Sequence, residues 1–163
     1  MLKILEDILK WIMYGDLTNP NVLFYQMART FLGRDASPSD EAPDELGCVD
    51  TVEEIYQALF GVYIAGHKTL STTVLYKKLN ASPLWERTAT PEEGSIIISP
   101  SGYSTKGYTH GHVGIVGENN IIMSNSSFPP NKGMFLENFT VDSWKRYYRA
   151  ALGFPVYYFR RKA

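Results

Sequence analysis

Apolar residues in the first half of the chain recur at the spacing of an α-helix. One stretch shows this clearly, because Val52, Ile55 and Leu59 lie three and four positions apart. Such a repeat places the apolar side chains on one helical face. The pattern predicts helices over residues 2–14, 22–32, 48–60 and 70–79.

Turn-forming residues separate these predicted helices. Asn19 and Pro20 precede the second helix and Gly33 follows it, as helix-capping residues usually do. Residues 33–47, GRDASPSDEAPDELG, are rich in Asp, Pro and Ser and have no apolar repeat, so they predict a loop. A loop of this length inside a compact domain is often functional.

The second half of the chain changes to short apolar runs rich in branched residues, which are typical of strands. The predicted strands cover 95–99, 112–117, 121–124 and 155–160, with a hairpin turn at 118–120 and a helix around 140–148. Helices followed by strands predict an α+β fold, with the helices packed on one face of an antiparallel sheet. We expect one domain over residues 1–163, with a helical part at about 1–85 and a sheet part at about 91–163.

The charge of the chain bears on its partners. A formal net charge of −1 argues against a nucleic-acid-binding protein, whose surface would be basic. The C-terminal end, residues 132–162, is locally basic. Such a run is usually a solvated face, but it would also suit an anionic polymer such as a bacterial cell wall.

Residues 2–14 are apolar enough to raise the question of a membrane segment or a signal peptide. Lys3, Glu6, Asp7 and Lys10 share one face of the predicted helix, which makes it amphipathic. A bilayer span needs about 20 mostly apolar residues, and no small-residue cleavage site follows this segment. We therefore expect no stable membrane span, no export signal, and synthesis in the cytoplasm.

The single cysteine, Cys48, excludes an intramolecular disulfide and a metal site of several cysteines. It follows Gly47 at the predicted start of a helix, where free backbone N–H groups and the helix dipole favour a negative charge. This position predicts a thiol pKa below the ordinary value, and hence a nucleophile that is alkylated faster than a free cysteine. The alternative is a small buried hydrophobic residue.

Among the three histidines, His112 has the most informative position. It opens the apolar run HVGIV, so a strand would aim its imidazole from a fixed place. A cysteine nucleophile needs such a base within hydrogen-bond reach, with a third polar group to orient the ring. A zinc site built from Cys48, His110 and His112 is a weaker alternative, because it would still need a carboxylate ligand.

The third polar group depends on the hairpin register. A two-residue turn at Asn119-Asn120 pairs Gly114 with Asn125 and places Asn125 on the strand face of His112. A three-residue loop shifts the register by one and places Ser124 there instead. Because an amide oxygen can accept the imidazole N–H, as in Cys-His-Asn enzymes, we predict that Asn125 orients His112.

Several segments together resemble the NlpC-like and CHAP families of papain-like cysteine peptidases, which cleave bacterial peptidoglycan. VLFYQMARTFLG is similar to the opening helix of those domains, and LGCVDTVEEIY to their nucleophile helix. TPEEGSIIIS is similar to the segment before an apolar strand, and GHVGIVGENNIIMSNSS to their histidine strand and hairpin. The resemblance covers most of the chain and implies a papain-like fold.

The chain departs from these families at two places. They often have Asp or Asn before the nucleophile and Ser-Gly after it, whereas this chain has Gly47 before Cys48 and Val49-Asp50 after it. The NlpC-like group commonly carries a tyrosine about a dozen residues before the cysteine. Here an acidic loop occupies that interval, so the second oxyanion donor is unassigned.

The resemblance implies a peptidoglycan hydrolase that cleaves an amide bond of the wall peptide through a thioester on Cys48. It would act as an endopeptidase or an N-acetylmuramoyl-L-alanine amidase, with His112 as acid and base and with no cofactor or metal. The combination also resembles phage lysis and tail-associated enzymes, which reach the wall through a holin or in a phage particle. The alternatives are another thiol amidase or acyltransferase on this fold, and a non-catalytic structural or wall-binding module.

Overall fold

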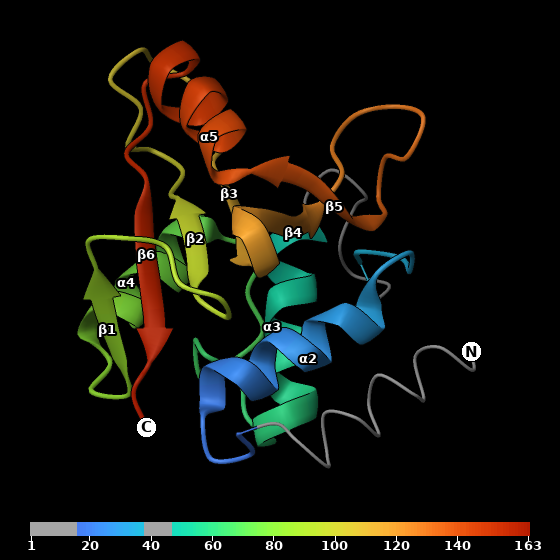
Figure 1. Cartoon of the computed structure of the whole chain (residues 1–163). Helices are drawn as coiled ribbons and strands as arrows, with labels where there is room; N and C mark the ends of the chain where they lie inside the picture. The colour runs from blue at the N-terminus through green and yellow to red at the C-terminus, as the bar shows by residue number, and fades with distance from the viewer. Residues whose placement is uncertain (1–15, 38–46) are drawn as a thin grey trace.

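The computed structural model describes residues 16–37 and 47–163 (Figure 1). The predicted helix over 2–14 and most of the predicted loop lie outside the described residues. Helix α2 spans Pro20–Phe31, and the Asn19 side chain accepts the main-chain N–H of Asn21 at its start. Because proline has no N–H to leave unpaired, Pro20 suits the first helical position.

Two further helices precede the sheet. Helix α3 spans Gly47–Phe60, and helix α4 spans Thr72–Ala81 with Ser71 as its N-cap. The sequence-based predictions for α2, α3 and α4 are therefore confirmed to within two residues at each end.

Six antiparallel strands form one sheet in the order β1-β6-β2-β3-β4-β5. The strands are β1 Trp85–Thr88, β2 Ile96–Ser99, β3 His112–Val116, β4 Ile121–Asn125, β5 Phe135–Thr140 and β6 Tyr157–Arg161. The sequence predicted the four inner strands and missed β1 and β5. Those two form the edges of the sheet, where fewer positions are buried and the apolar pattern is weak.

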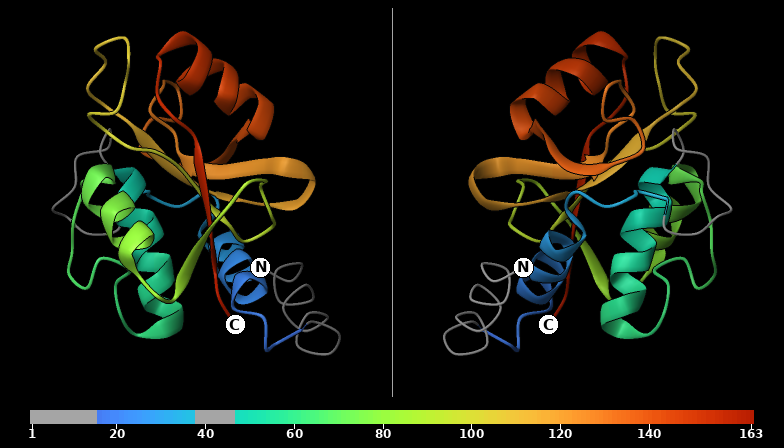
Figure 2. Two further views of the ribbon diagram at one scale, coloured as in Figure 1. Left: turned by 90° about the vertical axis from the view of Figure 1, so that its left-hand side faces the viewer. Right: turned by 90° about the vertical axis from the view of Figure 1, so that its right-hand side faces the viewer.

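Both faces of the sheet are covered. Val113 and Ile115 of β3 pack with α2 and α3, whereas Val116 packs with the helix that begins as α5, Val141–Trp144, and continues as the π-helical segment η3, Lys145–Ala151. Figure 2 shows α5 and η3 on the side of the strands away from α2 and α3. The expectation that the helices share one face is therefore incomplete, because β3 is buried on both sides.

Between β3 and β4, the Gly117 N–H donates to the Ile121 carbonyl and closes a three-residue loop, Glu118–Asn120, rather than the predicted two-residue turn. Asn119 and Asn120 have positive φ angles of 54° and 58°, which asparagine tolerates better than most residues. The register therefore pairs Gly114 with Ser124, so the prediction that Gly114 pairs with Asn125 is wrong by one residue. Side chains alternate along a strand, so Asn125 projects to the face covered by α2 and α3.

Candidate active site

Cys48 lies in the first turn of α3, as the sequence predicted, with 6% of its surface exposed. Its sulfur accepts main-chain N–H groups, including that of Val113 in β3, which ties the helix start to the strand. Burial nevertheless raises the pKa of the Cys48 thiol to about 11, and the N–H groups only partly offset this effect. The predicted lowering of this pKa is thus wrong for the described structure, because loss of hydration outweighs the favourable helix start.

His112 is the first residue of β3 and is 3% exposed. Its ring stacks on Trp144 and Tyr148, at centroid distances of 5.1 Å and 5.5 Å and interplanar angles of 22° and 19°. These aromatic neighbours remove water, and burial lowers the pKa of His112 to about 4. The imidazole is therefore neutral at neutral pH.

Cys48 and His112 are brought close together by neighbours that they share. Val113, which donates to the sulfur, directly follows His112. Tyr148 stacks on His112, and its own pKa is raised by burial and by the nearby Cys48. In the resting arrangement, a neutral thiol thus lies close to a neutral imidazole.

Ser124 is the side chain that holds the His112 ring. The Ser124 Oγ lies 3.1 Å from His112 Nε2 and donates to Asn138 Oδ1 over 2.7 Å. A serine hydroxyl has one proton to give, so Oγ must accept the contact from His112. The proton of the neutral imidazole therefore sits on Nε2, and Nδ1 keeps a free lone pair, as a general base requires.

Asn138 reaches Ser124 because of a β-bulge in β5. Ile122 pairs with Phe139 and Met123 with Glu137, which leaves Asn138 as the extra residue. Bulges often redirect a side chain beside a functional site. The Asn138 Nδ2 also donates to the Asn125 carbonyl oxygen over 3.2 Å, which fixes the amide so that Oδ1 faces Ser124.

The prediction that the Asn125 side chain orients His112 is therefore wrong, and Ser124 takes that place. Asn125 contributes through its main chain, which favours the protonated form of the His112 ring and so partly opposes the lowering of the imidazole pKa. The sequence analysis also missed Asn138. The only signal for it was the polar pair Glu137-Asn138 inside the apolar run FLENFT.

A cleft of about 390 Å³ opens on His112 and provides room for a substrate beside it. Its lining is largely aromatic, and Phe128 is exposed at its edge. The lining residues are His110, Gly111, His112, Ser127, Phe128, Tyr147, Tyr148 and Leu152.

The zinc alternative finds no support in the part of the chain that the structure describes. There, no three His, Cys, Asp or Glu side chains gather in a way that could hold a metal ion, and this applies to Cys48, His110 and His112. Within the same residues, none of the helices has the length and apolar character needed to cross a membrane.

No model of a known protein family matches the sequence, and no curated protein matches it. Among solved structures, the fold is similar to a chain of the native type VI effector–immunity complex Tae3–Tai3 from Ralstonia pickettii. The TM-score is 0.53 and the sequence identity is 17%, with 87% of this chain and 98% of that chain covered. The likeness confirms the predicted α+β, papain-like fold.

Proposed function

We propose that this protein is a thiol hydrolase that cleaves an amide bond in the peptide part of bacterial peptidoglycan, as an endopeptidase or an N-acetylmuramoyl-L-alanine amidase. The observation that carries the proposal is the arrangement of His112, Ser124 and Asn138 beside Cys48. This arrangement holds the proton of the buried His112 ring on Nε2 and leaves Nδ1 able to accept a proton from Cys48, the one thiol of the chain. The fold shared with a chain of a type VI effector–immunity complex supports it.

The resting protonation states define the order of the chemical steps. With a thiol pKa of about 11 and an imidazole pKa of about 4, an ion pair does not form in advance. The Cys48 sulfur attacks the amide carbon while its proton passes to His112 Nδ1. The main-chain N–H of Cys48, at the start of α3, stabilises the developing oxyanion.

Collapse of the tetrahedral intermediate completes the first half of the reaction. The C–N bond breaks, His112 returns the proton to the leaving amine, and a thioester remains on Cys48. Water then attacks the thioester with His112 as base, which releases a carboxylic acid and restores the thiol. No step requires a metal ion or a cofactor.

Mass spectrometry of digested sacculi tests the proposal. Purified sacculi treated with the protein should release fragments with one new amine and one new carboxyl group per cut. The masses assign the bond, because an amidase separates the peptide from the muramic acid and an endopeptidase cuts within the peptide. Sacculi of unchanged composition after prolonged treatment would contradict the proposal.

The second candidate is a wall-binding module without turnover, and the observation that favours it is the deep burial of a protonated Cys48. The two candidates differ in one result. A binding module would sediment with sacculi and release no fragments. In either case, we propose the bacterial cell wall as the place of action.

The pH profile should report His112. Since the imidazole must be neutral to accept the thiol proton, we expect kcat/KM to rise with pH through about 4 and to stay level at neutral pH. The measurement is hydrolysis of a soluble muropeptide from pH 3 upward. An acid limb near 6.5, the ordinary histidine value, would show a solvated ring and contradict the buried arrangement.

The activity profile needs a control that shows whether the protein is still folded at each pH. The pKa of His112 is lower in the folded than in the unfolded protein, so the unfolded chain gains a proton first as the pH falls. Stability is therefore lost between about 6.5 and about 4, by as much as about 3 kcal/mol. Near-UV circular dichroism at each pH separates this loss from titration of the active site.

Alkylation of Cys48 should be slow at neutral pH, contrary to the expectation from the helix start alone. A buried thiol with a pKa of about 11 is almost entirely protonated at pH 7, and the thiolate is the reactive form. We expect iodoacetamide to modify the folded protein more slowly than the same protein in urea, as read by intact mass. Faster modification of the folded protein would indicate an activated thiolate.

A further inference from the structure

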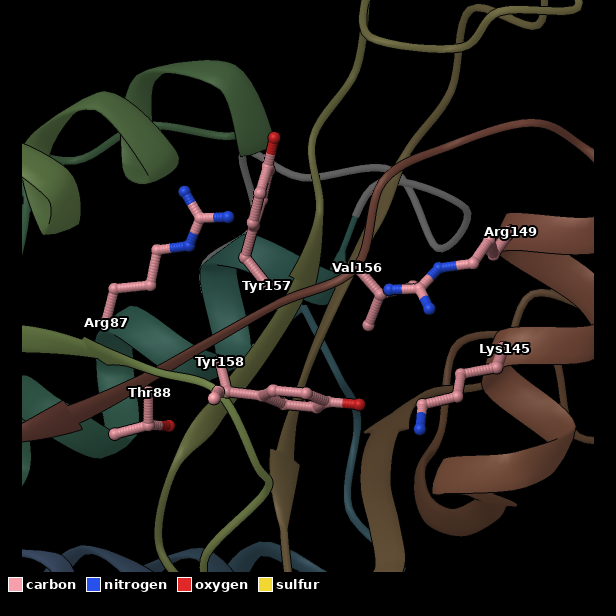
Figure 3. A pocket seen from close by; sticks show the side chains of 8 residues that line it. Arg87, Thr88, Lys145, Arg149, Val156, Tyr157 and Tyr158 are labelled. Carbon is pink, nitrogen blue, oxygen red and sulfur yellow. The ribbon is translucent and has the colours of Figure 1, made fainter.

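A second cleft, of about 440 Å³, lies between β1, β6 and η3 (Figure 3). Three of its lining side chains are basic, and no acidic side chain lines it among the described residues. The lining residues are Arg87, Thr88, Ala89, Lys145, Arg149, Val156, Tyr157 and Tyr158.

This cleft is separate from the candidate active site. Strand β6 is two strands away from β3, which corresponds to roughly 10 Å across the sheet. Trp144 and Tyr148 pack on His112, whereas Lys145 and Arg149 of the same helical segment line the second cleft. A ligand in this cleft would therefore not touch the imidazole.

Lys145 and Arg149 lie four positions apart and both extend into the cleft (Figure 3). Like charges at this spacing repel each other. Within the described residues neither forms an ion pair, including with Asp142, whose charge acts on Tyr158. An anion bound between the two cations would relieve this repulsion.

Tyr158 supplies the decisive observation. Its side chain is 5% exposed, and its hydroxyl has no hydrogen-bond partner among the residues that the structure describes. That hydroxyl points toward the side of the cleft formed by Lys145 and Arg149 (Figure 3). Buried polar groups without a partner are rare in folded proteins. Because burial raises the pKa of Tyr158, the hydroxyl keeps its proton and is ready to donate it.

We propose that this cleft binds an oxyanion, a carboxylate or a phosphate, held by the Arg149 guanidinium, the Lys145 ammonium and the Tyr158 hydroxyl. A guanidinium can donate two parallel hydrogen bonds to such a group. The cleft is larger than one oxyanion, so the ligand carries an organic part. That part would lie against the opposite wall, where the Arg87 guanidinium stacks 4.1 Å from the centre of the Tyr157 ring.

Calorimetric titration of the full chain with small probes tests the site. The probes are inorganic phosphate, glycerol 3-phosphate, N-acetyl-D-alanine, and the uncharged amide of N-acetyl-D-alanine. We expect saturable one-to-one binding of at least one oxyanion and none of the amide. Preference for the carboxylate assigns the site to peptide-like ligands, and preference for the phosphates assigns it to phosphate-bearing ones. Saturation by none of the three oxyanions would overturn the proposal.

Three variants link binding to the named side chains. Tyr158→Phe removes only the hydroxyl and should raise the Kd by about 10-fold. Arg149→Met removes a charged donor and should raise the Kd by at least as much. Arg146→Met is the matched control, because Arg146 lies on the same segment but lines a different cleft, so its Kd should not change. Equal affinity of the wild type and Tyr158→Phe, with unchanged thermal unfolding, would exclude the site. Wall hydrolysis should be the same in all four proteins, which keeps this test independent of the proposed function.

Discussion

Replacing Cys48 with alanine should abolish fragment release from sacculi, with a fall in turnover on the order of 10⁴-fold or more. Cys48 is the only thiol in the chain, so no other side chain can form the thioester. Cys48→Ser should be inactive as well, because an alcohol is far less acidic than a thiol, and an imidazole with a pKa of about 4 is too weak a base to activate it. The measurement is the rate of new amine groups on sacculi, with thermal unfolding recorded for each variant.

The control for this experiment is His67→Ala, which removes an exposed histidine far from the described site in sequence. It should digest sacculi at the rate of the wild type. His112→Ala, by contrast, should fail like Cys48→Ala, because the two residues act in one step. Undiminished digestion by Cys48→Ala would eliminate the thioester mechanism. A wild type that sediments with sacculi and releases no fragments would instead leave the wall-binding alternative.

The sequence predicted the elements of this site better than the contacts between them. The helical repeat in 48–60 and the apolar run after His112 depend on local patterns, and both elements form where the sequence predicted them. The hairpin register depends on one residue of loop length. Asn119 and Asn120 suit a two-residue turn as well as the observed three-residue loop, so local preference could not separate Ser124 from Asn125.

Asn138 lay beyond sequence reasoning for a different reason. A β-bulge forms when two strands pair with unequal residue counts, so it depends on both β4 and β5 and on the packing that aligns them. The strand β5 itself was missed, because Glu137 and Asn138 interrupt its apolar pattern. A residue that acts from a bulge on an unpredicted strand leaves no clear mark in a single sequence.

The protonation state of Cys48 shows the limit of a local electrostatic argument. The helix start was predicted correctly, and backbone N–H groups do favour a negative sulfur. The depth of burial, however, depends on how α3 packs against β3, and the sequence does not give that depth. Because burial acts more strongly than the N–H groups, the direction of the pKa shift was reversed.

Ser124→Ala should lower kcat/KM about 10- to 100-fold without unfolding the protein. The Ser124 hydroxyl accepts the proton on His112 Nε2, and its own proton is committed to Asn138. Without it, the ring proton redistributes to Nδ1, and that tautomer has no lone pair toward the thiol. The loss is smaller than for Cys48→Ala, since the reactive groups remain and only the tautomer population changes. The measurement is kcat/KM of the variant and of the wild type on a soluble muropeptide.

Two substitutions at Asn138 distinguish a positioning role from a structural one. Asn138→Asp keeps an acceptor for the Ser124 hydroxyl and should retain most activity, whereas Asn138→Ala should behave like Ser124→Ala. Nitrogen-15 spectra of the His112 ring should show the proton on Nε2 in the wild type and in Asn138→Asp. In Asn138→Ala and Ser124→Ala they should show a mixture of the two tautomers. Asn125→Ala is the matched control, because its side chain projects to the opposite face and the tautomer should not change. If Asn125→Ala alone altered the tautomer and Ser124→Ala did not, the network proposed for His112 would be wrong, whereas the assignment of Cys48 would still stand on its own test.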